Sequence, residues 1–222
     1  MKLINSWRFA VKCMKLSYNL KINILCMGFL FIMALVYEVF YVTAGLGAFL
    51  LLIIATYPAQ LIYSVCSSEL VQSSPYRRSL MTSLPTVLTL CSGMAVYLVI
   101  ICAEAVRAYV APEKAGHGSR TVLLCGIMLM LLNMYMGLAY KYFVLSWVIL
   151  AVSMMGYYYL SGLIGKGTAL SQNLFNIPMP ISVILGLCFA LAGNALQYGL
   201  SMLVYKKSMS RFAIFGLLRQ RA

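Results

Sequence analysis

Aspartate is absent from this 222-residue chain, which has four glutamates and a single histidine. Phosphatidyl-alcohol transferases need clustered aspartates to hold a metal ion, and intramembrane aspartyl proteases need an aspartate pair, so both classes are excluded. A rhomboid-type protease needs a histidine beside its serine, whereas His117 lies in a polar Gly-His-Gly loop. We therefore expect that the chain is not an enzyme by itself.

Metal-binding and disulfide motifs are also missing. The seven cysteines include no CxxC pair, and most of them lie inside apolar stretches. A zinc centre requires grouped cysteine and histidine ligands, and a disulfide framework requires cysteines at paired spacings. We expect small, buried, unpaired cysteines, with no metal and no cofactor in this chain.

Charged residues make up only 9% of the chain and hydrophobic residues 63%, a composition that excludes a soluble domain. The apolar stretches do not alternate with polar residues, as the strands of a membrane β-barrel do. A helix that crosses a hydrocarbon core of about 30 Å needs about 20 residues. The sequence therefore predicts an all-α integral membrane protein, one transmembrane domain over residues 1–222, with six spans at about 24–42, 47–66, 84–105, 121–140, 142–164 and 180–205.

Basic residues fall mainly on one side of these spans. With the N-terminus inside, the outer segments hold only four of the 17 lysines and arginines, namely Arg107, Lys114, Arg120 and Lys166. An excess of basic residues in short cytoplasmic segments fixes the orientation of a membrane protein. We expect a multi-pass protein of the cell membrane with both termini in the cytoplasm. Its net charge of +13 then faces anionic lipid and implies no nucleic acid partner.

Both ends of the chain carry basic residues outside the membrane bundle, which we place at residues 21–205. Within residues 1–20, an apolar face opposes a lysine- and arginine-bearing one; its members are Leu3, Ile4, Trp7, Val11 and Met14. Such a helix lies along the membrane surface. This helix either fixes the orientation of the chain in the membrane or forms an elbow that packs on a cytoplasmic partner. Residues 206–222 form a basic cytoplasmic tail.

The longest inner connection joins spans two and three and has the sequence SSELVQSSPYRRSLMTSLPT. Ser74 followed by Pro75 favours a helix start, with the hydroxyl as cap and proline in the first turn. We expect a short helix that carries Tyr76, Arg77 and Arg78, with Glu69 just upstream. The inner link between spans four and five is very short and contains Lys141.

Two outer segments differ in character. Residues 106–120 are polar and contain glycines, which predicts a loop. Residues 165–178 are too many for a turn and too apolar for a free loop. A re-entrant segment suits them, because irregular backbone at membrane depth must face protein or water.

Ionisable residues within a span are functional candidates, since their burial in the membrane is costly. Glu38 and Glu104 lie near the outer ends of spans one and three, and Glu104 can pair with Arg107 one turn on. Each has either a structural role or a place in a substrate path. Tyr135, Tyr157 and Tyr158 belong either to aromatic belts and packing or, with the 15 methionines, to an adaptable path for an amphipathic molecule.

An interfacial N-terminal helix, six spans, an inner loop folded as a short helix and an irregular outer segment between spans five and six occur together in one family. On these features and on the loop SSELVQSSPYRRSLMTSLP, the chain resembles the membrane-spanning (permease) subunit of an ABC-2-type ABC exporter. Among these, it is most similar to the peptide-exporting permeases of the phenol-soluble-modulin type. The resemblance covers almost the full length.

The resemblance implies a role for each part. Residues 1–20 would be the elbow helix, and residues from about 69 to 80 the coupling helix that contacts the ATP-binding subunit. Glu69, Tyr76, Arg77 and Arg78 would make this contact, and Lys141 a second, smaller one. Residues 165–178 would be the outer re-entrant hairpin.

The same resemblance implies partners that this chain lacks. A separate ABC ATP-binding subunit would supply ATP and Mg²⁺. A second permease copy, or a similar permease, would complete the path in a bacterial plasma membrane. The cargo would be an amphipathic peptide or a hydrophobic compound, with Glu38, Tyr135, Tyr157 and Tyr158 as candidate path residues.

Two other classes stay open. A substrate-binding membrane subunit of an energy-coupling-factor vitamin importer also has about six spans and this size. A non-transport membrane scaffold is the other alternative.

Overall fold

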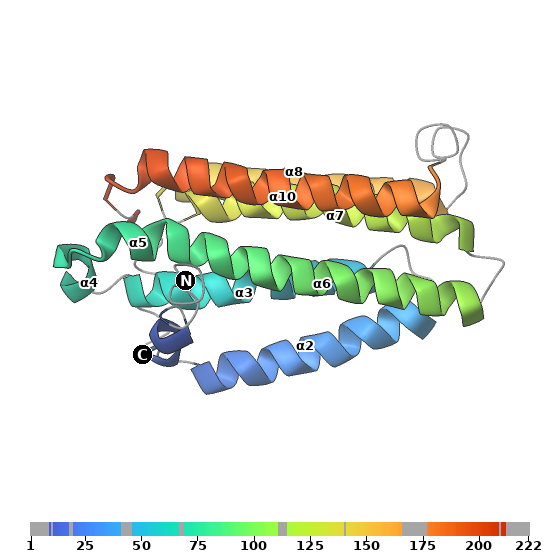
Figure 1. Cartoon of the computed structure of the whole chain (residues 1–222), viewed down its shortest axis with the longest axis horizontal. Helices are drawn as coiled ribbons and strands as arrows, with labels where there is room; N and C mark the ends of the chain where they lie inside the picture. The colour runs from blue at the N-terminus through green and yellow to red at the C-terminus, as the bar shows by residue number, and fades with distance from the viewer. Residues whose placement is uncertain are drawn as a thin grey trace.

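A computed structural model of the chain describes residues 9, 11–17, 20–40, 46–66, 69–110, 115–139, 141–165, 177–208 and 210–211. Within these ranges it does not describe the side chains of residues 39–40, 69–70, 110, 115–117 and 163–165. The described secondary structure is helical throughout (Figure 1). Its elements are α2 (Leu20–Phe40), α3 (Leu46–Cys66), α4 (Glu69–Ser73), α5 (Arg77–Met81), α6 (Ser83–Val110), α7 (Ala115–Leu138), α8 (Phe143–Gly165) and α10 (Met179–Val204).

Six of these helices are long and apolar enough to cross a membrane, which confirms the predicted number. The bounds of α2, α3, α6, α7, α8 and α10 agree with the predicted spans to within a few residues. Helices suit this environment because each backbone donor and acceptor finds its partner inside the same segment. The chain is therefore built as a multi-pass bundle of helices.

The outer segment 106–120 differs from the predicted loop. Helix α6 continues to Val110 and α7 already begins at Ala115, so the helices include Arg107, Gly116, His117 and Gly118. Arg107 is buried inside the bundle instead of lying in a loop. The prediction was wrong because it treated charge as a sign of solvent exposure, whereas Arg107 finds carboxylate partners within the protein. Residues 166–176, which make up most of the expected re-entrant segment, lie outside the described residues.

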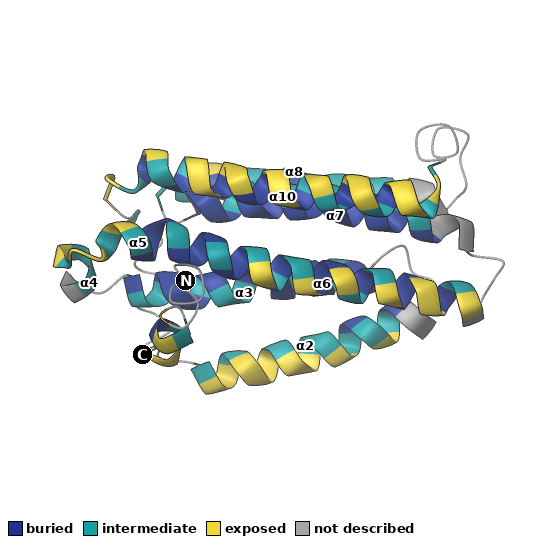
Figure 2. Cartoon of the chain, in the orientation of Figure 1, coloured by how far each residue is buried: buried dark blue, intermediate teal, exposed yellow. Residues whose placement is uncertain are grey.

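Helix α7 lies at the centre of the packing. Buried residues make up 72% of its span, against 6% in the span of α2 (Figure 2). Its closest neighbour is α10, because glycines bring the two backbones together. A Cβ atom on Gly126 would overlap the backbone of Gly186, and one on Gly193 would overlap the backbone of Met130. Small residues at such contacts are a common way to pack helices in membranes.

The two ends of the bundle gather different segments. At the end on the left of Figure 1, termed the α5 end, α5, the α7–α8 link and the end of α10 come together. At the opposite end, termed the Glu38 end, Glu38 of α2 meets Ala48 of α3 and Arg107 of α6. Successive long helices thus run in alternating directions between these ends, as the six-span prediction requires.

Part of the expected interfacial helix within residues 1–20 is described, and it is helical over residues 11–15. It packs on the α5 end. Cys13 is buried in a cluster with Ile62, Cys66 and Leu80, and the Ser17 hydroxyl lies 3.0 Å from the Ser64 hydroxyl. These contacts fix the segment to α3 and α5.

Candidate functional site

The predicted coupling segment consists of two short helices, α4 and α5, instead of one helix over about 69–80. The turn between them contains Ser74 and Pro75. The Ser74 hydroxyl accepts a hydrogen bond from the Tyr76 N–H at 3.0 Å, and the Ser74 carbonyl accepts one from the Arg77 N–H at 3.1 Å. The prediction of Ser74 as the helix cap was wrong: Tyr76 is the N-cap of α5 and no described side chain caps the helix, while the Ser74 hydroxyl stabilises the turn just before it.

Helix α5 is joined almost without interruption to α6. The Thr82 N–H and the Thr82 hydroxyl both donate to the Arg78 carbonyl, at 3.0 and 2.7 Å. The hydroxyls of Ser79 and Ser83 lie 3.0 Å apart across the same junction. Hydrogen bonds therefore link α5 to α6 across Thr82.

Predicted contact residues from different connections meet at the α5 end. The Lys141 ammonium donates a hydrogen bond to the Lys207 carbonyl, and the Lys207 ammonium donates to the Tyr142 hydroxyl and lies 4.5 Å from the centre of its ring. The Arg78 guanidinium lies 5.8 Å from the ring centre of Tyr205. The structure thus brings Arg78 and Lys141 together at the α5 end, next to the residues that follow α10. Glu69 begins α4 there, but its side chain is not described.

The charge at the α5 end is unbalanced. Among the described side chains, both salt bridges belong to Arg107 at the opposite end. Partial burial, together with the positive charge of nearby Arg77, lowers the pKa of Lys141 to about 8. This end therefore offers positive charge that is not paired with any described carboxylate.

An aromatic side chain stands beside this charge. Tyr76 is 62% exposed, and its ring centre lies 5.9 Å from that of Phe9 in the N-terminal segment. Exposed tyrosine and arginine side chains are typical of protein contact surfaces. The arrangement can bind a partner that presents acidic groups.

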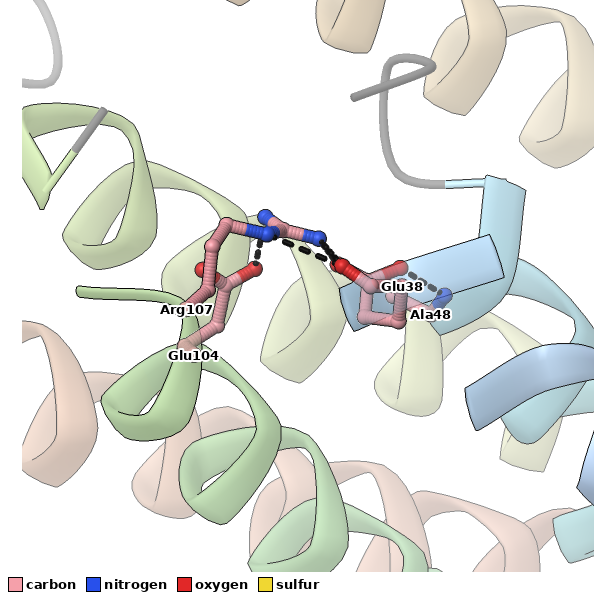
Figure 3. A network of polar contacts seen from close by, with 4 residues as sticks. All are labelled: Glu38, Ala48, Glu104 and Arg107. Carbon is pink, nitrogen blue, oxygen red and sulfur yellow. Dashed lines mark hydrogen bonds and ion pairs between the residues drawn. The ribbon is translucent and has the colours of Figure 1, made fainter. Parts of the chain in front are cut away.

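A second polar site occupies the Glu38 end (Figure 3). The Arg107 guanidinium lies between two carboxylates, with Nη2 at 2.5 Å from Glu38 Oε1 and Nη1 at 2.8 Å from Glu104 Oε1. Nε of Arg107 also donates to the Glu38 carbonyl at 2.9 Å. The other carboxylate oxygen of Glu38, Oε2, accepts the Ala48 N–H at 2.5 Å. We call Glu38, Glu104 and Arg107 the carboxylate network.

The predicted pairing of Glu104 with Arg107 is confirmed, whereas the pairing of Glu38 with Arg107 was not foreseen. These two residues are 69 positions apart. The side chain of Glu38 is only 1% exposed, and both of its oxygens accept hydrogen bonds. In this single chain Glu38 joins α2 to α3 and α6; its place in a substrate path stays a prediction.

The candidate path tyrosines do not form one site. Tyr157 is buried, with its ring centre 5.5 Å from that of Phe49. It also lines an apolar groove of about 490 Å³ between α7 and α8, together with Met128 and Met134. Tyr135 is half-buried against the core, whereas Tyr158 is 77% exposed on the bundle surface.

Polar residues of α6 and α10 form a further buried contact that the sequence reasoning missed. The Thr89 hydroxyl donates to Gln197 Oε1 at 2.6 Å, and Asn194 Nδ2 donates to the Thr86 carbonyl at 3.1 Å. Nε2 of Gln197 has no hydrogen-bond partner among the described residues. The signal was present in the sequence, because two amides three positions apart in an apolar helix share one face.

Comparison with known proteins adds no assignment: no protein-family model, no curated protein and no solved structure matches this chain.

Proposed function

We propose that the chain is the transmembrane subunit of an ATP-driven ABC exporter of the ABC-2 type, coupled to a separate ATP-binding subunit. In this proposal the partner binds ATP and Mg²⁺, both termini are cytoplasmic, and the protein resides in a bacterial plasma membrane. A second copy or a similar permease completes the path. The cargo is an amphipathic peptide or a hydrophobic compound.

The junction of α5 with α6 is the observation that carries the proposal. Helix α5 presents exposed Tyr76 and Arg78 at the end of the bundle, and its hydrogen bonds through Thr82 continue into a membrane-spanning helix. A soluble subunit that moves α5 would thereby move α6. Displacement of packed helices by a partner is a known form of conformational switching.

The charge of the α5 end specifies the partner further. Arg77, Arg78 and Lys141 lie at this end, where no described carboxylate pairs with them. The complementary surface on the ATP-binding subunit would be acidic. Such complementarity favours the correct partner and speeds association.

The groove between α7 and α8 supports an apolar cargo. Its lining of methionine, aliphatic and aromatic side chains suits molecules of variable shape, since methionine adapts easily to different surfaces. In the proposed exporter, cargo would enter this groove from the membrane.

The test is co-purification of the chain with its ATP-binding subunit, followed by ATPase measurement in lipid with and without amphipathic peptides. Stimulated hydrolysis by the complex supports the exporter. Absence of any co-purified ATPase contradicts it and favours the importer subunit or the scaffold.

Charge reversal at Arg77 and Arg78 tests the contact itself. We expect R77E/R78E to reduce recovery of the ATPase by about tenfold or more, since two lost contacts of about 1 kcal/mol each reach that factor. The matched control is K206E, which reverses an exposed charge at the same end but outside α5. Equal recovery from both variants would remove α5 from the contact.

A further inference from the structure

The carboxylate network contains more negative than positive charge. Two carboxylates, Glu38 and Glu104, contact the single guanidinium of Arg107 at 2.5 and 2.8 Å. The glutamate side chains are each 1% exposed and the arginine side chain 10%. If all three groups were ionised, the site would hold one uncompensated negative charge. A buried charge without a partner is costly at the edge of a membrane.

Within the described part of the chain, both ion pairs of these two carboxylates are with Arg107. Ala48 of α3 contributes a backbone N–H to Glu38. Among the described side chains of α7 and α8, the Cys125 thiol and the Tyr157 hydroxyl interact electrostatically with the network. Thiols and phenols are ordinarily neutral below about pH 8. A bound cation would supply the missing charge, and the smallest is a proton.

The contacts distinguish the two carboxylates. Both oxygens of Glu38 accept hydrogen bonds, from Arg107 and from the Ala48 N–H, so Glu38 is held as a carboxylate (Figure 3). Glu104 accepts from Arg107 through Oε1. Its Oε2 would be 3.1 Å from a Cβ atom on Gly118, so this oxygen lies against the first turns of α7.

We propose that the carboxylate network is a proton-binding site, in which Glu104 carries one exchangeable proton and Arg107 pairs with the Glu38 carboxylate. The site then has no net charge. The proton is exchanged with the aqueous phase at the Glu38 end, since Glu38 and Arg107 lie near the ends of their spans. No other reactant is needed.

Proton binding would control how firmly α2 is held. Only 6% of the α2 span is buried, and Glu38 supplies its charged contact with α6. While Glu104 is protonated, the guanidinium is available to Glu38. When Glu104 loses its proton, two carboxylates compete for Arg107 and the contact of α2 with α6 weakens. This role does not depend on transport, so it holds whether or not the chain is a permease subunit.

Infrared spectroscopy of the purified full-length chain in lipid tests the proposal, because a protonated carboxyl group has a C=O stretching band that shifts in deuterium oxide. We expect this band at neutral pH in the unmodified protein and its loss in E104Q. E38Q should lose it as well, because one guanidinium then faces one carboxylate and Glu104 ionises. If E104Q does not fold, E38Q decides the matter.

The matched control is E69Q, which removes a glutamate outside the spans and should leave the band unchanged. Absence of the band from the unmodified protein would overturn the proposal, as would its persistence in E104Q. Persistence in E38Q would equally overturn it, since the proton would then not depend on sharing of Arg107.

Discussion

Single charged residues behave differently at the two ends of the bundle. Arg107 is buried and lies between two carboxylates, so burial costs it little. Lys141 is half-buried, and the described contact of its ammonium is with the neutral carbonyl of Lys207. Burial, together with the charge of Arg77, therefore lowers the pKa of Lys141 to about 8. At the Glu38 end, two carboxylates offset the cost of burying the Arg107 charge. At the α5 end, the cost of burying the Lys141 charge weakens the affinity of its amine for a proton.

The reactivity of Lys141 tests this difference. We expect its amine to react with an acylating reagent along a pH profile with a midpoint at about 8, with the exposed Lys206 as an internal reference. Mass spectrometry of the peptides measures both. A profile for Lys141 that coincides with that of Lys206 would contradict the burial of its ammonium.

The free energy of unfolding should change with pH as Lys141 loses its proton. The unfolded chain holds the Lys141 proton up to an ordinary pKa of about 10.4, whereas the folded chain releases it at about 8. Between these values the unfolded state binds more protons, so stability rises with pH. The neutral variant K141M should therefore be more stable than the unmodified protein below pH 8. This advantage should disappear toward pH 10, as thermal unfolding across pH would show.

At the scale of helices, close backbone approach is most extensive between α7 and α10. Gly126 and Gly186 leave no room for a side chain between them, whereas Gly156 of α8 has open space around its Cβ position. The α2–α3 pair also has one such approach, since a Cβ atom on Gly47 would overlap the backbone of Ala34 and Glu38. Between α7 and α8 the structure instead has the groove of about 490 Å³. The α7–α10 pair makes the close contact at both Gly126 and Gly193, whereas α7 and α8 are more loosely packed.

Alanine substitution at two glycines measures this contrast. We expect G126A to lower stability by about 1–3 kcal/mol, the usual cost of overpacking. G156A should be neutral or stabilising by up to about 1 kcal/mol, because alanine favours a helix over glycine. Denaturation of both variants in detergent gives the comparison. Similar losses in the two would mean that α7 and α10 are not in backbone contact.

At the scale of the whole molecule, the sequence predicted what depends on local composition. Apolar run length gave six spans with bounds close to those of the helices, and Ser74 marked the turn just before α5. Contacts across the bundle were not predictable in this way. Glu38 meets Arg107 at a separation of 69 residues, and Gly126 meets Gly186, because of how helices pack and not because of a local pattern. Arg107 was misplaced because its partners lie partly on another helix.

Cysteine labelling can test which end of the bundle faces the cytoplasm. In a background without native cysteines, we expect Y109C at the Glu38 end to react with a membrane-impermeant maleimide on intact cells. S208C at the α5 end should react only after permeabilisation. Both positions are exposed, so accessibility within the protein does not separate them. The reverse pattern would invert the predicted topology.

The separation of Glu38 from Arg107 also bears on biogenesis. Helix α2 leaves the ribosome long before α6, so its glutamate reaches the membrane when the arginine has not yet been synthesised. During that interval Glu38 must stay at the lipid headgroups or take up a proton. The contact of α2 with α6 through Glu38 can therefore form only after the third span has been synthesised.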